Sequence, residues 1–395
     1  MLQTLKQLPV DPILGLAAAA RADTNPDKVD LTVGVYMDDA GVCPVFEAVR
    51  RAQNALDAEE VTKAYLPAAG DEAFNHGMQR LLLGSDSATL AQGRVSSIQT
   101  PGGCGALRIG AEVVYAASPT ARVWVSDPTW PVHLPLLGSV GLTFETYRYY
   151  DPVSHGVDFD AMASDLAQAR EGDVVLLHGC CHNPCGADLT LEQWTIVARM
   201  AEKQGFTPMV DIAYQGLAQG LEEDAAGLRV LVDYLPEVLI AASCSKNMGL
   251  YRERTGIAVF VCQDATTATR TLDQSKAAAR RVYSMPPAHG ALLAGRILAD
   301  AELDSLWRDE LGQMCARINR LRTDVRRALE AKTGADFAFI EQERGMFSFL
   351  GLSTAQAVRL REEFSVYMLE SSRINVAGVN TANIDYFAEA VAQVL

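Results

Sequence analysis

The stretch that decides the fold is VVLLHGCCHNPCGADLTLEQWTIVARMAEKQGFTPMVDI, residues 174–212. It begins with VVLLH (174–178) and ends with MVDI (209–212), two short apolar runs without polar alternation, as is typical of parallel strands covered on both faces. Between them, Thr190 and Gln193 form a capping-box pattern that predicts the start of a helix. The apolar face of this helix is expected to consist of Leu191, Trp194, Val197, Ala198 and Ala201. The stretch therefore predicts a strand–helix–strand unit.

Three further apolar runs have the same character. They lie at 122–126 (RVWVS), 238–242 (VLIAA) and 256–262 (GIAVFVC). Repetition of strands and amphipathic helices predicts a large, doubly wound, mainly parallel α/β domain over the middle two thirds of the chain.

The C-terminal part has a different pattern. Strands are expected at 346–350 (MFSFL) and 374–377 (INVA), with a helix capped by Ser353 and Gln356 between them. A closing helix is marked by the apolar residues Ile384, Phe387, Ala388, Val391 and Leu395. We therefore expect a smaller α+β domain, joined to the large one through a long helical stretch at 302–332. The expected division is 1–43 (N-terminal arm and part of the small domain), 44–311 (large domain) and 312–395 (small C-terminal domain).

Composition excludes several classes of protein. Of the 395 residues, 49% are hydrophobic, enough for a large core, so general disorder is excluded. Acidic residues outnumber basic ones by 49 to 34, a net charge of −15, which argues against nucleic acid as the main partner. No apolar run approaches the length of a membrane span.

The N-terminal region and the cysteines bear on location. The apolar run 13–20 follows Asp11 and Pro12, with Lys6 the only basic residue upstream, so we interpret it as part of a mature N-terminal arm rather than a signal peptide. The eight cysteines are expected to be reduced. We expect a cytoplasmic protein.

Five features carry the chemistry. Lys246 follows a buried strand, where desolvation can lower its pKa and leave a nucleophilic amine. Asp211 ends the strand 209–212 and Tyr214 follows, so both are expected at the same edge of the sheet as Lys246. Arg254 suits a bidentate phosphate contact, and TPGGCG (100–105) opens a helix whose backbone amides could approach an anion. Together these features indicate pyridoxal phosphate, because the lysine can bind its aldehyde, the acid can pair with its ring nitrogen, and the glycine-rich turn with Arg254 can bind its phosphate.

The sequence also resembles a known family over nearly its whole length: class I, subgroup α, aminotransferases, which include bacterial aspartate and aromatic amino acid aminotransferases. The resemblance implies a fold type I transferase that depends on pyridoxal phosphate. The motifs that carry it are 11–16 (DPILGL), 34–36 (GVY), 65–66 (YL), 100–103 (TPGG), 126–130 (SDPTW), 178–184 (HGCCHNP), 211–216 (DIAYQG), 245–247 (SKN), 283–290 (YSMPPAHG) and 373–378 (RINVAG).

Carried over residue by residue, the resemblance assigns roles around the cofactor ring. Lys246 is expected to bond to the cofactor and to shuttle the proton between the substrate Cα and the cofactor C4′. Asp211 is expected to keep the pyridine nitrogen protonated. Tyr214 and Asn183 would hydrogen-bond the phenolic oxygen of the ring, and Trp130 would stack on it.

The same resemblance places the cofactor phosphate between several groups. The backbone amides of Gly103 and Cys104 would bind it, together with the hydroxyls of Ser243 and Ser245 and the guanidinium of Arg254.

Four more residues are assigned to the phosphate and to the substrate. Tyr65 would reach the phosphate of the neighbouring subunit, which implies a homodimer with shared active sites. Arg373 would bind the substrate α-carboxylate, and Arg280 of the partner subunit the distal carboxylate of dicarboxylic substrates. Gly34 would lie where the small domain closes over the substrate.

Three other interpretations compete with transamination. His178, Cys180, Cys181, His182 and Cys185 could provide soft metal ligands, but strand alternation should separate these side chains, and we expect no metal. A nicotinamide dehydrogenase should carry GxGxxG after its first strand, and 100–105 lacks that spacing. A lyase or β-decarboxylase is conceivable on the same fold, although the pair of Arg280 and Arg373 favours transamination with a dicarboxylate.

Five positions depart from the aspartate-specific pattern, and each replaces a polar residue with a less polar one. They are Met37, Cys43, Ala64, Cys104 and Met285. Such changes favour a pocket that accepts an aromatic ring. We therefore expect transfer of the α-amino group from aromatic L-amino acids (tyrosine, phenylalanine, possibly tryptophan) and dicarboxylic ones to 2-oxoglutarate by a ping-pong route, the alternative being an aspartate-specific aminotransferase.

Overall fold

The computed structural model describes all 395 residues, Met1–Leu395. The chain forms two compact units. One consists of Met1–Cys43, Pro184–Gly186 and Ile318–Leu395, and the other of Pro44–Asn183 and Ala187–Arg317. No helix of either unit is both long and apolar enough to cross a membrane.

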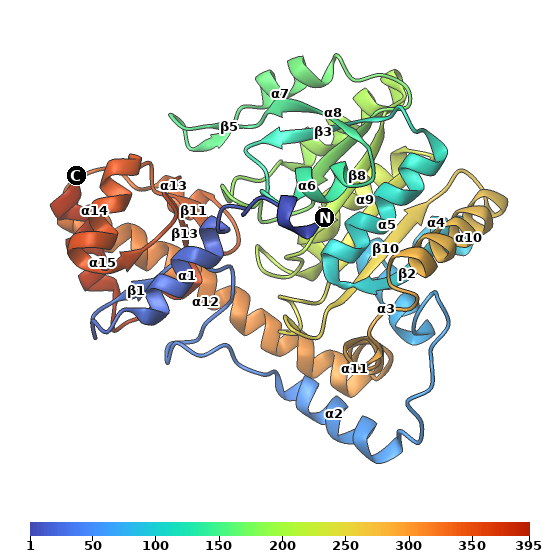
Figure 1. Ribbon diagram of the computed structural model, residues 1–395, viewed down its shortest axis with the longest axis horizontal. Helices are drawn as coiled ribbons and strands as arrows, with labels where there is room; N and C mark the ends of the chain where they lie inside the picture. The colour runs from blue at the N-terminus through green and yellow to red at the C-terminus, as the bar shows by residue number, and fades with distance from the viewer. The chain divides into compact units, whose positions relative to one another are not determined.

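The larger unit is built on a seven-stranded sheet, drawn in cyan to yellow in Figure 1. In spatial order the strands are β2 (Val95–Pro101), β10 (Thr255–Val261), β9 (Val238–Ser243), β8 (Thr207–Ile212), β7 (Val174–His178), β3 (Arg122–Asp127) and β4 (Thr143–Arg148). Successive residues of β7 and β10 are buried, so both faces of the sheet are covered. The predicted doubly wound, mainly parallel sheet is thus confirmed.

One strand runs against the expectation of parallel pairing. The predicted strand at 256–262 is present as β10, but it pairs antiparallel with both β2 and β9. The physical reason is the length of the connection. A parallel crossover needs a dozen or more residues, usually including a helix, whereas residues 244–254 connect β9 to β10 through turns alone. This short connection contains Lys246 and Arg254, so both residues lie at the edge of the sheet where β9 ends and β10 begins.

Helices cover the sheet of the larger unit. They are α2 (Glu47–Glu59), α3 (Glu72–Leu83), α4 (Ala88–Ala91), α5 (Gly102–Ala117), α6 (His133–Gly138), α7 (Phe159–Leu166), α8 (Leu191–Gln204), α9 (Leu221–Tyr234), α10 (Ala265–Val282) and α11 (Ala288–Ala299). A short hairpin is formed by β5 (Tyr150–Asp151) and β6 (Gly156–Val157). The helix α5 packs on β9 and β10, and α10 packs on α5 and β2.

The predicted capping box of α8 is present, with Thr190 and Gln193 each accepting the other's backbone N–H. Four of the five predicted face residues are buried. Leu191 is the exception, with 55% of its surface exposed. A helical side chain covers the turn that precedes its own Cα, and the first helical residue has no such turn beneath it.

The smaller unit combines the two ends of the chain. Its elements are η1 (Leu2–Thr4), α1 (Pro12–Ala22), β1 (Val29–Asp30), α13 (Phe339–Gln342), β11 (Phe347–Phe349), α14 (Thr354–Phe364), β12 (Val366–Tyr367), β13 (Arg373–Asn375), η2 (Val376–Gly378) and α15 (Ile384–Val394). The strands β1 and β12 pair in parallel, and β11 pairs antiparallel with β13. The helix α12 (Ala301–Thr333), predicted at 302–332, contains the boundary between the units.

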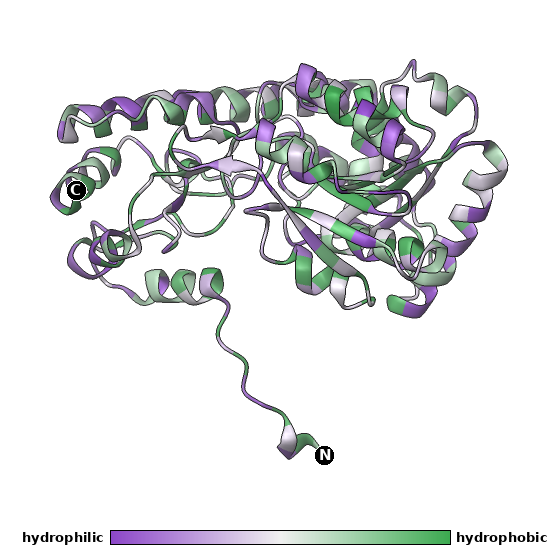
Figure 2. Ribbon diagram, turned by 90° about the horizontal axis from the view of Figure 1, so that it is seen from above, coloured by the Kyte–Doolittle hydropathy of each residue, from purple (hydrophilic) through white to green (hydrophobic).

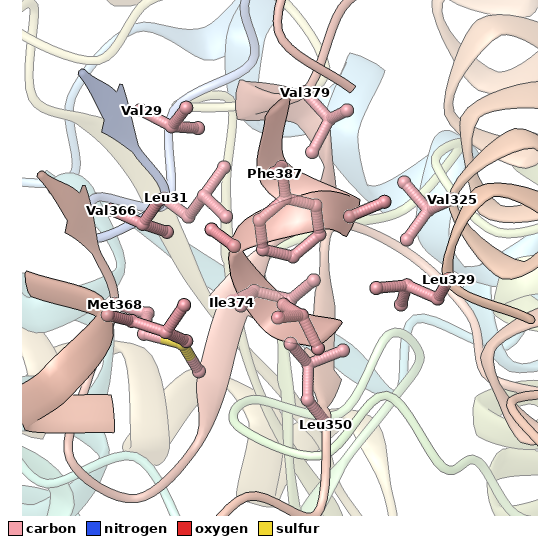
Figure 3. Packing of buried hydrophobic residues seen from close by; sticks show 14 of the residues in the cluster. Val29, Leu31, Val325, Leu329, Leu350, Val366, Met368, Ile374, Val379 and Phe387 are labelled. Carbon is pink, nitrogen blue, oxygen red and sulfur yellow. The ribbon is translucent and has the colours of Figure 1, made fainter. Parts of the chain in front are cut away.

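The core of the smaller unit is apolar and draws on both ends of the chain. Val29 and Leu31 meet Val366, Ile374 and Phe387, all nearly or fully buried (Figure 3). The first ten residues lie outside this core. They are exposed and extend away from α1 as a single segment that ends in η1 (Figure 2).

Candidate active site

The site of the larger unit lies at the carboxyl ends of neighbouring strands. Register pairs His178 at the end of β7 with Asp211 on β8, and Ser243 at the end of β9 with Gly256 on β10. Because β7, β8 and β9 are parallel, their last residues meet at one edge, which is where open α/β sheets bind ligands.

Lys246 is held in a tight turn just beyond β9. The backbone N–H of Gly249 donates to the Lys246 carbonyl over 3.1 Å, and the buried Trp307 indole donates to the Asn247 carbonyl over 2.7 Å. The Lys246 amine lies 4.6 Å from the centre of the Tyr214 ring. Burial lowers the pKa of Lys246 and outweighs the attraction of Asp211, so the amine loses its proton more readily than an ordinary lysine does.

Asp211 is positioned by a histidine that the sequence analysis did not identify. His133 Nε2, at the start of α6, lies 3.0 Å from Asp211 Oδ2. Burial alone would raise the pKa of Asp211, but the hydrogen bond from His133 and the neighbouring positive charges hold that pKa below its ordinary value. An ionised carboxylate only accepts hydrogen bonds, so the proton of this contact belongs to His133 Nε2.

The hydrogen bonds continue beyond His133. Thr129 Oγ1 lies 2.8 Å from His133 Nδ1 and 3.2 Å from His178 Nε2. The ring of His178 lies 3.9 Å from that of His182, whose Nε2 is 3.1 Å from Ser126 Oγ. Thr129 and His133 follow β3 with no periodicity to mark them, although both lie close to Trp130, which the motif SDPTW did indicate.

The helix α5 begins with a cradle that only glycine allows. Gly102 has φ +70°, and a Cβ there would lie 2.4 Å from Arg254 Nη2. A Cβ on Gly256 would lie 2.4 Å from the Gly102 carbonyl carbon. The Arg254 guanidinium is oriented by donating from Nη1 to the Tyr251 carbonyl over 2.7 Å. A fixed cation and the free N–H groups of a 16-residue helix therefore converge on one point, which suits a phosphate.

The remaining predicted cofactor residues are buried or packed within the larger unit. Ser243, Ser245, Asn183 and Tyr214 are all less than a tenth exposed. Trp130 packs edge-on against His133, with ring centres 5.3 Å apart.

Gly103 and Cys104 occupy the first turn of α5, as expected. Burial raises the pKa of the Cys104 thiol even though Arg254 and Lys246 act in the opposite direction, so the thiol is neutral. At the position where the family pattern has a threonine, the cradle thus presents a weak hydrogen-bond donor.

Four predicted residues are not part of this cluster. Tyr65 is 91% exposed, and Arg280 is exposed at the end of α10, where it donates to Ser284 Oγ over 2.5 Å. Gly34 and Arg373 belong to the smaller unit. There Arg373 is buried, and its Nη2 donates to the Thr32 carbonyl over 2.5 Å.

The proposed metal ligands of residues 178–185 do not form one cluster. The rings of His178 and His182 contact each other at an angle of 32°, and Tyr149 stacks on His182 with ring centres 4.3 Å apart. Cys180 and Cys181 instead lie near the carboxylate of Asp224. That carboxylate accepts four backbone N–H groups, those of Gly216, Ala218, Gln219 and Gly220. Its lone pairs are thus committed to the loop that follows Tyr214.

The donor set fits pyridoxal phosphate. The glycine cradle with Arg254 provides for a phosphate, Asp211 is an ionised carboxylate for a protonated ring nitrogen, and Lys246 is an amine of lowered pKa for an aldehyde. When bound, this cofactor supplies an electron sink for carbanion chemistry. The fold and the site together define the class of pyridoxal-phosphate-dependent enzymes.

Comparison with known proteins identifies the family. The family model for aminotransferase class I and II matches residues 26–391. The chain is 46% identical to the aspartate aminotransferase of Salmonella typhi over 396 residues, and 46% identical to the aromatic-amino-acid aminotransferase of Paracoccus denitrificans over 397 residues, with full coverage of both partners in each case.

A solved structure extends this similarity to three dimensions. It is the aromatic-amino-acid aminotransferase from Burkholderia pseudomallei covalently bound to pyridoxal phosphate, with a TM-score of 0.98 and 42% identity over 100% of this chain and 99% of that chain. The chain belongs to the class I and II aminotransferases. It is an aminotransferase that uses pyridoxal phosphate, and the family, fold, activity and cofactor predicted from the sequence are confirmed.

Proposed function

We propose that this aminotransferase acts on both aromatic and dicarboxylic L-amino acids, and that 2-oxoglutarate accepts the amino group in a ping-pong reaction. Identity alone does not discriminate between the two substrate classes, because the aspartate and aromatic relatives are equally similar to the chain. The observation that carries the proposal is the loss of polar groups at Met37, Cys43, Ala64, Cys104 and Met285. A less polar lining lowers the cost of placing an apolar ring in a site that also binds carboxylates.

In this proposal the residues of the larger unit bind the cofactor and move protons. Lys246 bonds to the cofactor, and its Nζ takes the proton from the substrate Cα, a role suited to an amine whose pKa is lowered by burial. Asp211, oriented by His133, accepts the hydrogen bond of the ring nitrogen. Tyr214 and Asn183 bind the phenolic oxygen of the ring, and Trp130 stacks on its face.

The phosphate of the cofactor is assigned to the start of α5. The amides of Gly103 and Cys104, the hydroxyls of Ser243 and Ser245, and Arg254 hold it there. Convergence of Arg254 on the Gly102 backbone supports this assignment.

We further propose a homodimer in which Tyr65 and Arg280 complete the site of the partner subunit. Tyr65 exposes nearly its whole side chain. An aromatic side chain contributes a large apolar area when it is buried, so a partner surface that covers Tyr65 would be stabilised. It lines an open groove of about 830 Å³ together with Ala64 and Met285, two of the five less polar positions. A partner copy seated there would bring these residues into a shared site. A cytoplasmic location remains a prediction from the sequence.

Substrate recognition is assigned to two arginines. Arg373 binds the α-carboxylate that every substrate carries, Arg280 binds the second carboxylate of aspartate and glutamate, and Gly34 lies where the smaller unit covers the substrate. A charge-assisted bidentate contact between a guanidinium and a carboxylate suits the role of each arginine.

The test is to measure the half-reaction of each amino acid separately, following the cofactor spectrum with aspartate, tyrosine, phenylalanine and tryptophan. We expect turnover with aspartate and with at least one aromatic substrate. An enzyme that reacts with aspartate but with no aromatic amino acid would instead be the aspartate-specific alternative.

A further inference from the structure

Within the smaller unit, the guanidinium of Arg373 rests on an aromatic ring. Its Cζ lies 4.4 Å from the centre of the Phe347 ring. The two residues are diagonal neighbours on the strand pair β11–β13, where Phe349 is directly opposite Arg373 and Phe347 is opposite Asn375. Diagonal neighbours on one face of a sheet are within reach of long and aromatic side chains, so the ladder itself sets up this contact.

The backbone of Gly34 closely approaches the Cζ end of the Phe347 ring. A Cβ built on Gly34 would lie 2.6 Å from Phe347 Cζ and 3.2 Å from Cε1. The segment is held against the ring by Asn375, whose Nδ2 donates to the carbonyls of Val33 and Val35, each over 2.8 Å. The Phe347 ring thus contacts both the Arg373 guanidinium and a backbone position that has no room for a side chain.

The backbone that carries Phe347 is fixed by a second, fully buried arginine. Arg322 donates to the carbonyls of Gly345 and Phe347, at 2.8 Å and 2.5 Å, and to that of Ile340 at 2.8 Å. Its Nη1 lies 3.4 Å from a carboxylate oxygen of Glu343. Buried N–H groups of this kind are costly to leave unpaired, so Arg322 holds the turn before β11 in one conformation.

We propose that Phe347 is a positioning residue for substrate binding: held by Arg322 and Gly34, its ring keeps the Arg373 guanidinium in the one orientation that receives the substrate α-carboxylate. This inference rests on the proposed function, which assigns that carboxylate to Arg373. The Thr32 carbonyl takes one Nη2 hydrogen and the ring supports the flat face of the guanidinium. A guanidinium whose plane is fixed in this way has the orientation that a bidentate carboxylate contact requires.

The expected consequence is a binding effect rather than a rate effect. Without the ring, Arg373 samples more rotamers, and ordering it on binding would weaken carboxylate affinity by about three- to tenfold. The probe is 3-phenylpropionate, a carboxylate without an amino group, titrated against the holoenzyme while the cofactor spectrum is followed. The Phe347→Leu variant should raise the Kd by that factor, and in the phenylalanine half-reaction it should raise KM more than it lowers kcat.

Two further variants separate positioning from general destabilisation. Phe387→Leu alters a similarly buried phenylalanine in the hydrophobic core of the smaller unit and should lower Tm while leaving the Kd unchanged. Gly34→Ala should weaken binding as Phe347→Leu does, because the new methyl group displaces the ring. In the double variant the shorter leucine leaves room for that methyl group, so the two losses should not add.

Arg373→Lys provides the reference for the proposed function. If Arg373→Lys weakens binding but Phe347→Leu does not, the inference is overturned and the proposed function stands. If Arg373→Lys itself binds 3-phenylpropionate normally, the assignment of Arg373 fails and the inference fails with it. Should Phe347→Leu not fold, an unchanged Kd in Gly34→Ala would overturn the inference, and a raised Kd would support it.

Discussion

His133 and Asp211 lie 78 residues apart in the chain, yet His133 Nε2 is 3.0 Å from Asp211 Oδ2 at the edge of the sheet. This contact keeps the pKa of Asp211 below its ordinary value in a place where burial would otherwise raise it. The charge that a protonated ring nitrogen needs therefore depends on a residue of a different element, the first residue of α6.

Replacing His133 by asparagine tests this dependence. The amide is too short to span the gap, and a hydrogen bond to a charged group contributes about 1.5–3 kcal/mol, so kcat/KM should fall by about tenfold or more. Loss of the donor also raises the pKa of Asp211, so the acid limb of the pH–rate profile should move to higher pH. His155→Asn, at a histidine bonded to Tyr150 outside the site, serves as the control and should change neither quantity.

Lys246→Ala should abolish covalent retention of the cofactor. Borohydride should fix pyridoxal phosphate to the wild-type chain at Lys246 and leave the variant unlabelled. Without the amine that moves the Cα proton, turnover should fall by at least about 10²–10⁴-fold, the usual contribution of a general base. Lys203→Ala, at an exposed lysine of α8, is the matched control. Labelling of a different lysine in the native protein would contradict the assignment.

Arg280→Ala should discriminate between substrate classes. Aspartate and 2-oxoglutarate lose a charge-assisted contact of about 1.5–3 kcal/mol, so their specificity constants should fall by about tenfold to a hundredfold, while that for phenylalanine changes little. The control is Arg281→Ala, which removes the adjacent arginine that pairs with Glu112 over 3.2 Å. Equal losses for aspartate and phenylalanine would mean that Arg280 is structural.

Mixed dimers test whether the active site is shared. Lys246→Ala and Arg280→Ala should each be poorly active with aspartate, but a hybrid dimer contains one site with both residues intact. Activity with aspartate should therefore return when the two variants are unfolded together and reassembled. An active monomer, found by sedimentation at assay concentration, would rule the shared site out.

The buried histidines should make the enzyme sensitive to acid. Burial lowers the pKa of His182 to about 3, against an ordinary value of 6.5 that applies in the unfolded chain. Between these values the unfolded state binds more protons, so stability is full above pH 6.5 and falls as the pH drops towards 3. At pH 5 the loss from His182 alone is about 2 kcal/mol. Urea unfolding of wild type and His182→Asn between pH 5 and 7 should reveal a shallower pH dependence in the variant.

Much of the molecule follows from short stretches of sequence. Residues 174–212 were sufficient to predict a strand, a capped helix and a second strand, because burial, capping and helix periodicity act between residues a few positions apart. The glycines at 100–105 indicated a phosphate cradle for the same reason, since the conformation that allows it is a property of those residues. The strand before Lys246 likewise placed that lysine at a sheet edge.

Other features depended on the tertiary structure. The direction of β10 was set by a connection too short for a crossover, and the hydrogen bond of His133 to Asp211 was set by strand order and register. Phe347 meets Gly34 only because the two ends of the chain form one core, in which Val29 pairs with Val366. Such contacts join residues far apart in the chain, and no local pattern encodes them. The sequence thus determined which chemical groups are available, and packing decided which of them touch, because side chains meet only after the sheet and the core have closed around them.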